Sequence, residues 1–183
     1  QGANKFLFNL APYLSIVFAL VGFVAIPIGD RLIIGTRVIE LQAANINIAL
    51  LFIFAMMSMG IYGVVLAGFS SNNNYAFLGG MRGAAQMIAY EITMGAAIMG
   101  IILVFNTLDL QQLVRAQGDY LLYGWLPKWG VFVQPLAFLL FLTAATAETK
   151  RVPFDLPEGE SEIIGYFVEY SGMKFGMFFL ADL

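Results

Sequence analysis

Residues 48–69 read IALLFIFAMMSMGIYGVVLAGF and carry no acidic or basic side chain. An apolar α-helix of about 20 residues is long enough to span the hydrocarbon core of a lipid bilayer. The uncharged stretch around this run extends from 41 to 81, and three further uncharged stretches cover 6–29, 92–108 and 129–147. The sequence therefore predicts an all-α fold, a polytopic bundle of transmembrane helices.

The composition supports a membrane protein and excludes several kinds of function. Of the 183 residues 60% are hydrophobic and 11% charged, with a mean hydropathy of +0.82, whereas soluble domains are about 45–50% apolar and about 25% charged. The chain has neither Cys nor His, which removes thiolate ligands for iron–sulfur clusters and the usual haem, zinc and copper ligands. The net charge of −3 and the lack of a basic run argue against nucleic acid as a partner. Any electron carrier must therefore belong to a partner or be a diffusible small molecule.

We expect one transmembrane domain over 1–183, made of about five apolar segments at 8–28, 48–69, 84–105, 131–147 and from 172 onward. Polar loops are expected near 30–47, 70–83 and 106–130, and an acidic loop at 148–171. The chain begins at Gln1 rather than Met and stops within an apolar run. We therefore expect it to be an internal piece of a longer subunit.

Small residues are dense within two of the expected spans. Gly60, Gly63 and Gly68 lie in the second, and Gly95 and Gly100 lie in the third. Such residues let membrane helices approach closely. They predict helix–helix contacts rather than a cofactor site.

The strongest anomaly is the stretch 148–162, which reads ETKRVPFDLPEGESE. Six of the twelve acidic residues lie between 148 and 169, with two cations among them. One interpretation is a solvated surface, with carboxylates that favour a helix N-terminus. The other is a partly buried funnel at the membrane surface, where the carboxylates titrate as a coupled set. The Phe, Leu, Ile and Tyr residues that continue to Tyr170 favour the second interpretation.

A second anomaly is Glu91, inside the third expected span. Ionisable groups within the membrane are costly, tend to face the interior of the bundle and often carry function; a position close enough to the interface for solvation is the alternative. Arg82 and Gln86, which lie just before Glu91, are four residues apart and share a face if this stretch is helical. Arg82 is a candidate counter-charge or donor to a ligand carbonyl, and equally a simple cationic anchor at the interface.

These residues resemble a known family. The stretch 147–162, the element EYSGMKF at 169–175, the QPLAF run at 134–138 and the run from 63 to 91 are similar to the H subunit of NADH:quinone oxidoreductase, that is, respiratory complex I (subunit 1 in mitochondria). The resemblance implies a subunit of eight transmembrane helices, of which this chain would hold the second to the sixth. It also implies a membrane subunit that forms the quinone-access tunnel and begins the proton-coupling path of a proton-translocating enzyme.

The resemblance assigns roles by position. Quinone binding would fall to Arg82, Gln86, Phe154 and Glu158, and the proton path to Glu91, Glu148, Asp155, Glu158, Glu160, Glu162 and Glu169. No metal site and no complete active site are expected on this chain. Quinone would be the substrate, nothing would be bound covalently, and FMN and iron–sulfur clusters would belong to partner subunits. Departures from the family are Lys150, where Asn is commoner, Asn74, where Lys is frequent, and a stretch 163–168 that is one residue short.

The implied partners are other membrane subunits, the hydrophilic arm of the complex, quinone and the lipid bilayer. The implied location is the bacterial inner membrane, with several spans and with the acidic loop on the cytoplasmic side. Two alternatives stay open. One is the membrane anchor of an energy-converting hydrogenase-type complex, which couples ferredoxin oxidation to ion pumping, and the other is a channel or secondary transporter.

Overall fold

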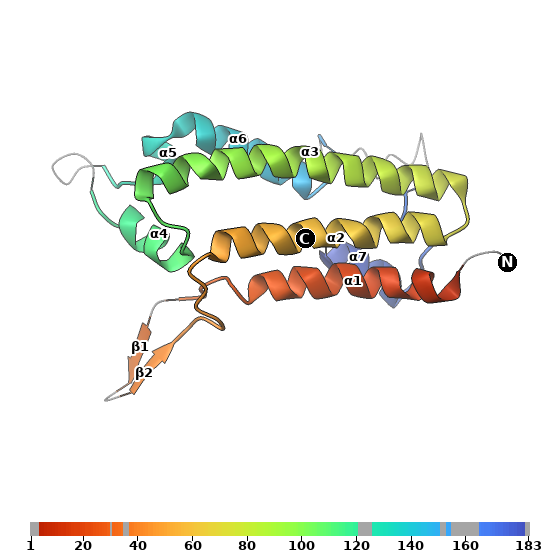
Figure 1. Ribbon diagram of the computed structural model, residues 1–183, viewed down its shortest axis with the longest axis horizontal. Coiled ribbons are helices and arrows are strands. Elements are labelled where there is room, and N and C mark those ends of the chain that lie inside the picture. The colour runs from red at the N-terminus through yellow and green to blue at the C-terminus, as the bar shows by residue number, and fades with distance from the viewer. Residues whose placement is uncertain are drawn as a thin grey trace.

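The computed structural model describes residues 4–29, 31–34, 37–120, 126–150, 153–154 and 165–181. The strands β1 (Arg31–Ile34) and β2 (Arg37–Glu40) pair as an antiparallel hairpin. The helices are α1 (Lys5–Phe23), α2 (Ala49–Ser70), α3 (Asn74–Phe105), α4 (Leu110–Gln117), α5 (Gly130–Val133), α6 (Pro135–Glu148) and α7 (Met173–Ala181). The expected all-α bundle is confirmed (Figure 1).

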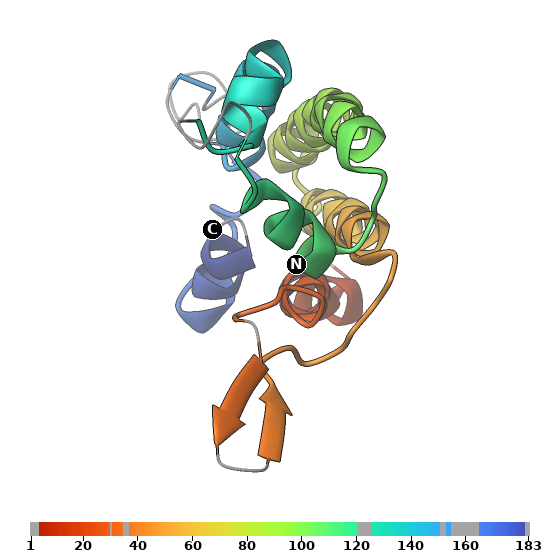
Figure 2. The same cartoon turned by 90° about the vertical axis from the view of Figure 1, so that its left-hand side faces the viewer.

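The long helices form a row onto which the last two helices pack. The helix α2 lies between α1 and α3, α6 packs on α3, and α7 packs on α1. Figure 2 shows this arrangement almost end-on, with α1, α2 and α3 stacked in one row and α6 and α7 alongside it. Within the described residues α1, α2 and α3 are long and apolar enough to cross a membrane, and α6 is a shorter apolar helix.

Small residues allow the helices of this row to pack closely. The sequence predicts such contacts for all the glycines of the second and third spans, and the structure has them at some of these glycines. A Cβ added to Gly63 would lie 2.0 Å from the Ser15 Oγ, and one added to Gly68 would lie 2.9 Å from the Ala76 carbonyl oxygen. Such short distances leave no room for a side chain, so α1, α2 and α3 meet backbone to backbone. Gly60 and Gly95 differ, because nothing lies within 4 Å of their added Cβ atoms.

The connections contain more regular structure than expected. The helix α3 begins at Asn74, so most of the expected loop at 70–83 is helical; the Asn73 side chain accepts a hydrogen bond from the Tyr75 N–H at 3.0 Å and caps it. The expected loop at 30–47 contains the β1–β2 hairpin, and the one at 106–130 contains α4. Local polarity marks these segments as lying outside the membrane, but it does not exclude short helices and strands there.

The fourth expected span, 131–147, is a broken helix. Pro135 has no N–H to donate and restricts the residue before it to extended backbone. Gln134 accordingly has φ −140° and ψ 71° and separates α5 from α6. Its side chain lies against Gly100 of α3, whose added Cβ would be 2.4 Å from the Gln134 Oε1. Because Gly100 has no side chain, the side chain of Gln134 fits against α3 where the helix is broken.

Candidate functional site

A surface pocket of about 440 Å³ lies between α3 and the chain that follows α6. Three of the four residues predicted to bind quinone, Arg82, Gln86 and Phe154, line it. Tyr90 completes the face that Arg82 and Gln86 begin, since the three are spaced by four residues on one helix. The rings of Tyr90 and Phe154 meet edge to face at 5.6 Å. The pocket therefore combines aromatic walls with guanidinium and amide groups.

Gln86 ties α3 to the end of α6. Its Nε2 donates to the carbonyl oxygens of Ala147, at 3.0 Å, and of Phe154, at 2.7 Å. Its Oε1 is buried and has no hydrogen-bond partner among the described residues. A buried acceptor without a partner is costly and is a natural place for a ligand donor or a water molecule.

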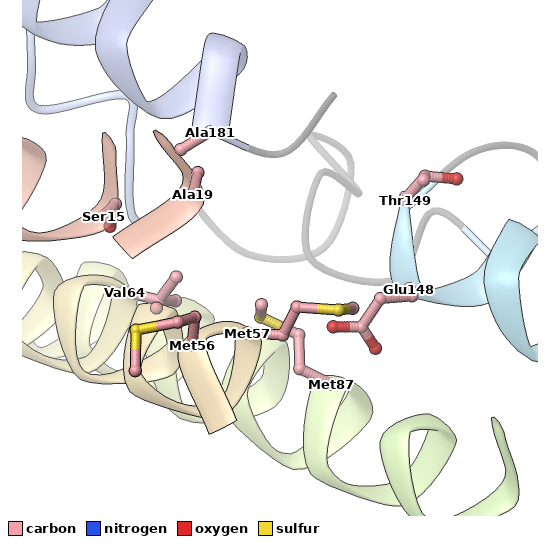
Figure 3. A pocket seen from close by; sticks show the side chains of 10 residues that line it. Ser15, Ala19, Met56, Met57, Val64, Met87, Glu148, Thr149 and Ala181 are labelled. Atoms are coloured by element: carbon pink, nitrogen blue, oxygen red, sulfur yellow. The ribbon is translucent and has the colours of Figure 1, made fainter. Parts of the chain in front are cut away.

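Glu148 faces a second cavity, of about 180 Å³, which is lined by residues of five helices and is partly open. Figure 3 shows its carboxylate directed toward Met57 of α2 and Met87 of α3, with Ser15 of α1 and Ala181 of α7 on the opposite side. The Ser15 hydroxyl is buried and has no hydrogen-bond partner among the described residues. The Glu148 carboxylate and two hydroxyl-bearing residues, Ser15 and Thr149, thus share a cavity that is otherwise lined by apolar and small residues.

Glu91 lies near the middle of α3 and is partly buried. Its Oε1 accepts a hydrogen bond from the Ser58 hydroxyl of α2, and that hydroxyl also lies 3.0 Å from the Phe54 carbonyl oxygen. Met87, four residues before Glu91, and Met57, next to Ser58, both line the cavity of Glu148. The Glu91–Ser58 pair therefore lies about one helical turn from that cavity.

The turn at 165–170 packs onto the bundle, as the aromatic residues of the acidic segment predicted. Tyr166 and Tyr170 are buried in the core, and the Tyr170 ring stacks on Phe8 of α1 at 4.0 Å. Burial raises the pKa of the Tyr170 phenol, and the hydroxyl of Ser70 partly opposes this. Glu169 is exposed and accepts a hydrogen bond from the Asn73 side chain at 2.8 Å.

The structure thus distributes the predicted site over several places. Arg82, Gln86 and Phe154 come together in one pocket, Glu148 lies in the other cavity, Glu91 lies a turn away from it, and Glu169 is at the surface. The remaining predicted residues, Asp155, Glu158, Glu160 and Glu162, lie outside the described residues. No group of three metal-ligating side chains occurs among the residues that the structure describes.

Three polar residues of these sites were not singled out from the sequence. Ser58 bonds Glu91, Ser15 faces the cavity of Glu148, and Tyr166 accepts a hydrogen bond from Lys150. Ser15 and Ser58 are polar residues within apolar spans, which is a signal the sequence does offer. Their partners are far away along the chain, so the pairings themselves follow from the packing.

The whole chain matches a family model described as NADH dehydrogenase, over residues 1–183. The H subunit of the NADH-quinone oxidoreductase of Thermomicrobium roseum is 45% identical over 183 residues, covering 98% of this chain and 54% of that protein. The H subunit numbered 1 of Solibacter usitatus is 47% identical over 180 residues, covering 98% and 45%. The H subunit of Protochlamydia amoebophila is 44% identical over 185 residues, covering 100% and 54%.

The chain spans about half the length of the curated relatives it matches. The match is nevertheless continuous along this sequence and includes every segment that lines the two cavities. On that ground the chain belongs to the NADH dehydrogenase family, in which its relatives are the H subunits of NADH-quinone oxidoreductases.

Proposed function

We propose that this chain forms part of the quinone-access tunnel of a proton-translocating NADH:quinone oxidoreductase and contains the start of its proton-coupling path. The observation that carries the proposal is the position of α3 between two different cavities. Gln86 lines the pocket with Arg82 and Phe154, and its neighbour Met87 lines the cavity of Glu148. A single turn of helix therefore separates a place for an apolar ligand from the cavity that the partly buried Glu148 faces.

The pocket of Arg82 has the chemistry of a quinone head-group site. A quinone is a flat apolar ring with two carbonyl oxygens, which accept hydrogen bonds but cannot donate them. The guanidinium of Arg82 donates to such oxygens, while Tyr90 and Phe154 offer ring surfaces. Ligand sites in proteins are typically of this kind, with apolar walls and a few convergent polar groups.

The cavity of Glu148 has the chemistry of a proton path. A carboxylate that shares a cavity with a hydroxyl, among mostly apolar residues, holds a proton or releases it with less competition from bulk water than at the surface. Glu91 continues this polar line into the middle of α3. We assign Glu169, at the surface, to the outer end of the path, together with the acidic residues between 155 and 162.

Gln86 supplies a direct connection between the two cavities. It lines the quinone pocket and donates to the carbonyl oxygen of Ala147, the residue before Glu148. A change in charge or hydrogen bonding at the head group therefore acts on the helix end that carries Glu148. Reduction of a quinone to a quinol takes up two electrons and two protons. The carboxylates would supply these protons.

Partner subunits must supply the electrons. This chain has no Cys or His to hold an iron–sulfur cluster or a haem. We therefore place FMN and iron–sulfur clusters on the other subunits of the complex. We also propose the bacterial inner membrane as its location, with the end of the bundle that carries Arg82 and the acidic segment on the cytoplasmic side, against the hydrophilic arm.

The proposal is tested on the whole complex reconstituted in vesicles, with quinone reduction and proton uptake measured together. Glu148→Gln and Glu91→Gln are each expected to lower proton-coupled turnover by about tenfold or more, as loss of a proton-transfer group does. Gln86→Met is expected to raise the KM for quinone. Asp119→Asn, at an exposed position in the connection between α4 and α5, is the control and is expected to resemble the parent protein.

Wild-type turnover and pumping in both Glu→Gln variants would refute the proton path. An unchanged KM for quinone in Gln86→Met would refute the quinone pocket, provided that the complex contains the normal amount of this subunit.

A further inference from the structure

Ser58 of α2 has two acceptors for one hydroxyl hydrogen. Its Oγ lies 3.0 Å from the Phe54 carbonyl oxygen, and it is also hydrogen-bonded to the Glu91 Oε1 of α3. A hydroxyl group has a single hydrogen and two lone pairs. Ser58 therefore donates fully to only one of the two acceptors at a time, and its lone pairs stay available for a donor.

Glu91 depends on this hydroxyl. Among the residues that the structure describes, Ser58 is the sole hydrogen-bond partner of the Glu91 carboxyl group. Thr93, two residues further along α3, bonds the Ala89 carbonyl oxygen of its own helix instead. A carboxyl group within the membrane is costly in either form unless it is hydrogen-bonded. The Ser58 hydroxyl must therefore serve the ionised form of Glu91 as well as the protonated form.

The two forms of Glu91 make opposite demands on Ser58. An ionised carboxylate only accepts hydrogen bonds, whereas a protonated carboxyl group has an O–H that donates. When Glu91 is ionised, the Ser58 hydroxyl donates to it. When Glu91 is protonated, its O–H donates to the Ser58 Oγ, and the Ser58 hydrogen turns to the Phe54 carbonyl oxygen. Both arrangements fit the same positions of the heavy atoms, because both contacts of Ser58 are already in place.

The pair lies at the edge of the cavity of Glu148. Met57, the residue before Ser58, lines this cavity, and so does Met87, about one helical turn before Glu91. The bond between Ser58 and Glu91 thus joins α2 to α3 beside the proposed proton path.

We propose that Ser58 is a positioning residue of the proton path: its hydroxyl donates to Glu91 when this carboxyl group is ionised and to the Phe54 carbonyl oxygen when Glu91 is protonated. Glu91 carries the transferred proton, and Ser58 keeps its own hydrogen throughout. The rotating hydroxyl holds Glu91 against α2 in both states. This inference rests on the proposed proton path and adds a residue of α2 to it.

The test uses the assembled complex in vesicles and measures kcat, the KM for quinone and the protons translocated per quinone reduced. Ser58→Ala removes the hydroxyl and is expected to lower kcat by about fivefold, the scale of one lost hydrogen bond. The KM should stay within about twofold, because quinone binding is not affected. Thr93→Ala removes a hydroxyl that bonds its own helix and is the matched control, which is expected to resemble the parent protein.

Ser58→Thr is the conservative variant that should rescue activity. A threonine in a helix also bonds the carbonyl oxygen four residues before it, as Thr93 and Thr143 do in this chain. The variant keeps a hydroxyl with both acceptors and is expected to retain at least about half of kcat. Ser58→Cys keeps a side chain of similar size with only a weak donor, and it is expected to lose about as much kcat as Ser58→Ala.

A double variant shows whether Ser58 acts through Glu91. Ser58→Ala in the Glu91→Gln background is expected to cause no loss beyond that of Glu91→Gln alone, because the carboxyl group that Ser58 serves is then absent. Contributions that act through one group are not additive in such a cycle. If the two losses multiply instead, Ser58 acts elsewhere and the inference is overturned.

Infrared difference spectra of the oxidised and reduced complex test the bond itself. The carboxyl C=O band of Glu91 is the one that Glu91→Gln removes. Ser58→Ala is expected to move this band to higher frequency, because the C=O bond of a carboxyl group stiffens when a hydrogen bond is lost. A band at the parental frequency overturns the inference, since Ser58 then does not bond the protonated form.

Parental kcat in Ser58→Ala also overturns the inference, as does an equal loss in Ser58→Thr and Ser58→Ala. If Ser58→Ala fails to assemble, parental kcat in Ser58→Cys overturns it, because the hydroxyl is then not needed. The inference and the proposed function fail separately. If Glu148→Gln and Glu91→Gln lower proton coupling but Ser58→Ala does not, this inference alone is refuted, whereas unchanged Glu→Gln variants refute the path itself.

Discussion

Gly63 and Gly60 lie three residues apart on α2 and have opposite surroundings. A Cβ at Gly63 would meet the Ser15 Oγ at 2.0 Å and the Ala11 carbonyl oxygen at 3.0 Å, whereas one at Gly60 meets nothing within 4 Å. Gly60 borders the cavity of Glu148. Gly63 therefore allows α1 and α2 to pack closely, whereas Gly60 leaves space beside the cavity of Glu148. The first glycine is needed for the fold, and the second is expected to be needed for the proposed function.

The largest effect is expected from Gly63→Leu. The side chain would enter the contact between α1 and α2, where backbone atoms cannot move aside, and such overpacking costs about 1–3 kcal/mol or more. We expect the variant subunit to be nearly absent from purified complex, measured as its amount relative to a neighbouring subunit. A normal amount would show that α1 and α2 separate more easily than their packing indicates.

A different kind of loss is expected from Gly60→Leu. The added side chain enters the cavity of Glu148 without meeting the backbone, so the complex should assemble while turnover falls by about tenfold, the scale of a lost proton-transfer group. The measurement is kcat at a normal subunit content. Gly95→Leu is the matched control, because the added Cβ at Gly95 also meets nothing within 4 Å but Gly95 lines neither cavity. Equal activity in Gly60→Leu and Gly95→Leu would show that turnover does not depend on the open space beside Gly60.

A smaller effect connects Gly63 to Ser15. Gly63→Ala alone should lower the thermal stability of the complex, and Ser15→Ala should restore part of the loss because it removes the atom closest to the new Cβ. Residues in direct contact show coupling free energies of about 0.5–3 kcal/mol in such cycles. Thermal denaturation of the parent protein, the two single variants and the double variant measures this coupling free energy. Additive effects of the two substitutions would mean that the Ser15 Oγ is not the obstacle.

The smallest effect is expected from Gly95→Ala. No atom obstructs the new methyl group, and Ala is favoured over Gly in a helix interior by about 1 kcal/mol. Thermal stability should therefore rise slightly while quinone reduction stays at the parental level. A clear loss of stability would indicate that another part of the complex packs against this turn of α3.

The sequence was sufficient to predict the architecture and the shared helix face of Arg82 and Gln86. Uncharged runs such as 48–69 identify membrane helices by length alone, and the spacing of Arg82 and Gln86 placed them on one face of a helix, where the structure also has them. Both inferences depend on local geometry, which a single segment determines by itself.

What could not be predicted depends on contacts between distant segments. A helix surrounded by lipid and by other helices is apolar on all sides, so no polar stripe indicates which side faces which neighbour. The hydrogen bond between Ser58 and Glu91 and the burial of Lys150 on Tyr166 follow from that arrangement. The break at Gln134 is intermediate, because Pro135 signals it while its position against Gly100 needs the fold.

The helix α3 has 32 residues, which at 1.5 Å per residue correspond to about 48 Å. The hydrocarbon core of a bilayer is about 30 Å thick, so α3 must tilt or project beyond the lipid, and its tilt depends on membrane thickness. The pocket of Arg82 and the cavity of Glu148 share α3 as a wall. A change in membrane thickness should thus alter both cavities together. The acyl chain length of the lipids is therefore a means of varying, from outside the protein, how the two cavities are coupled.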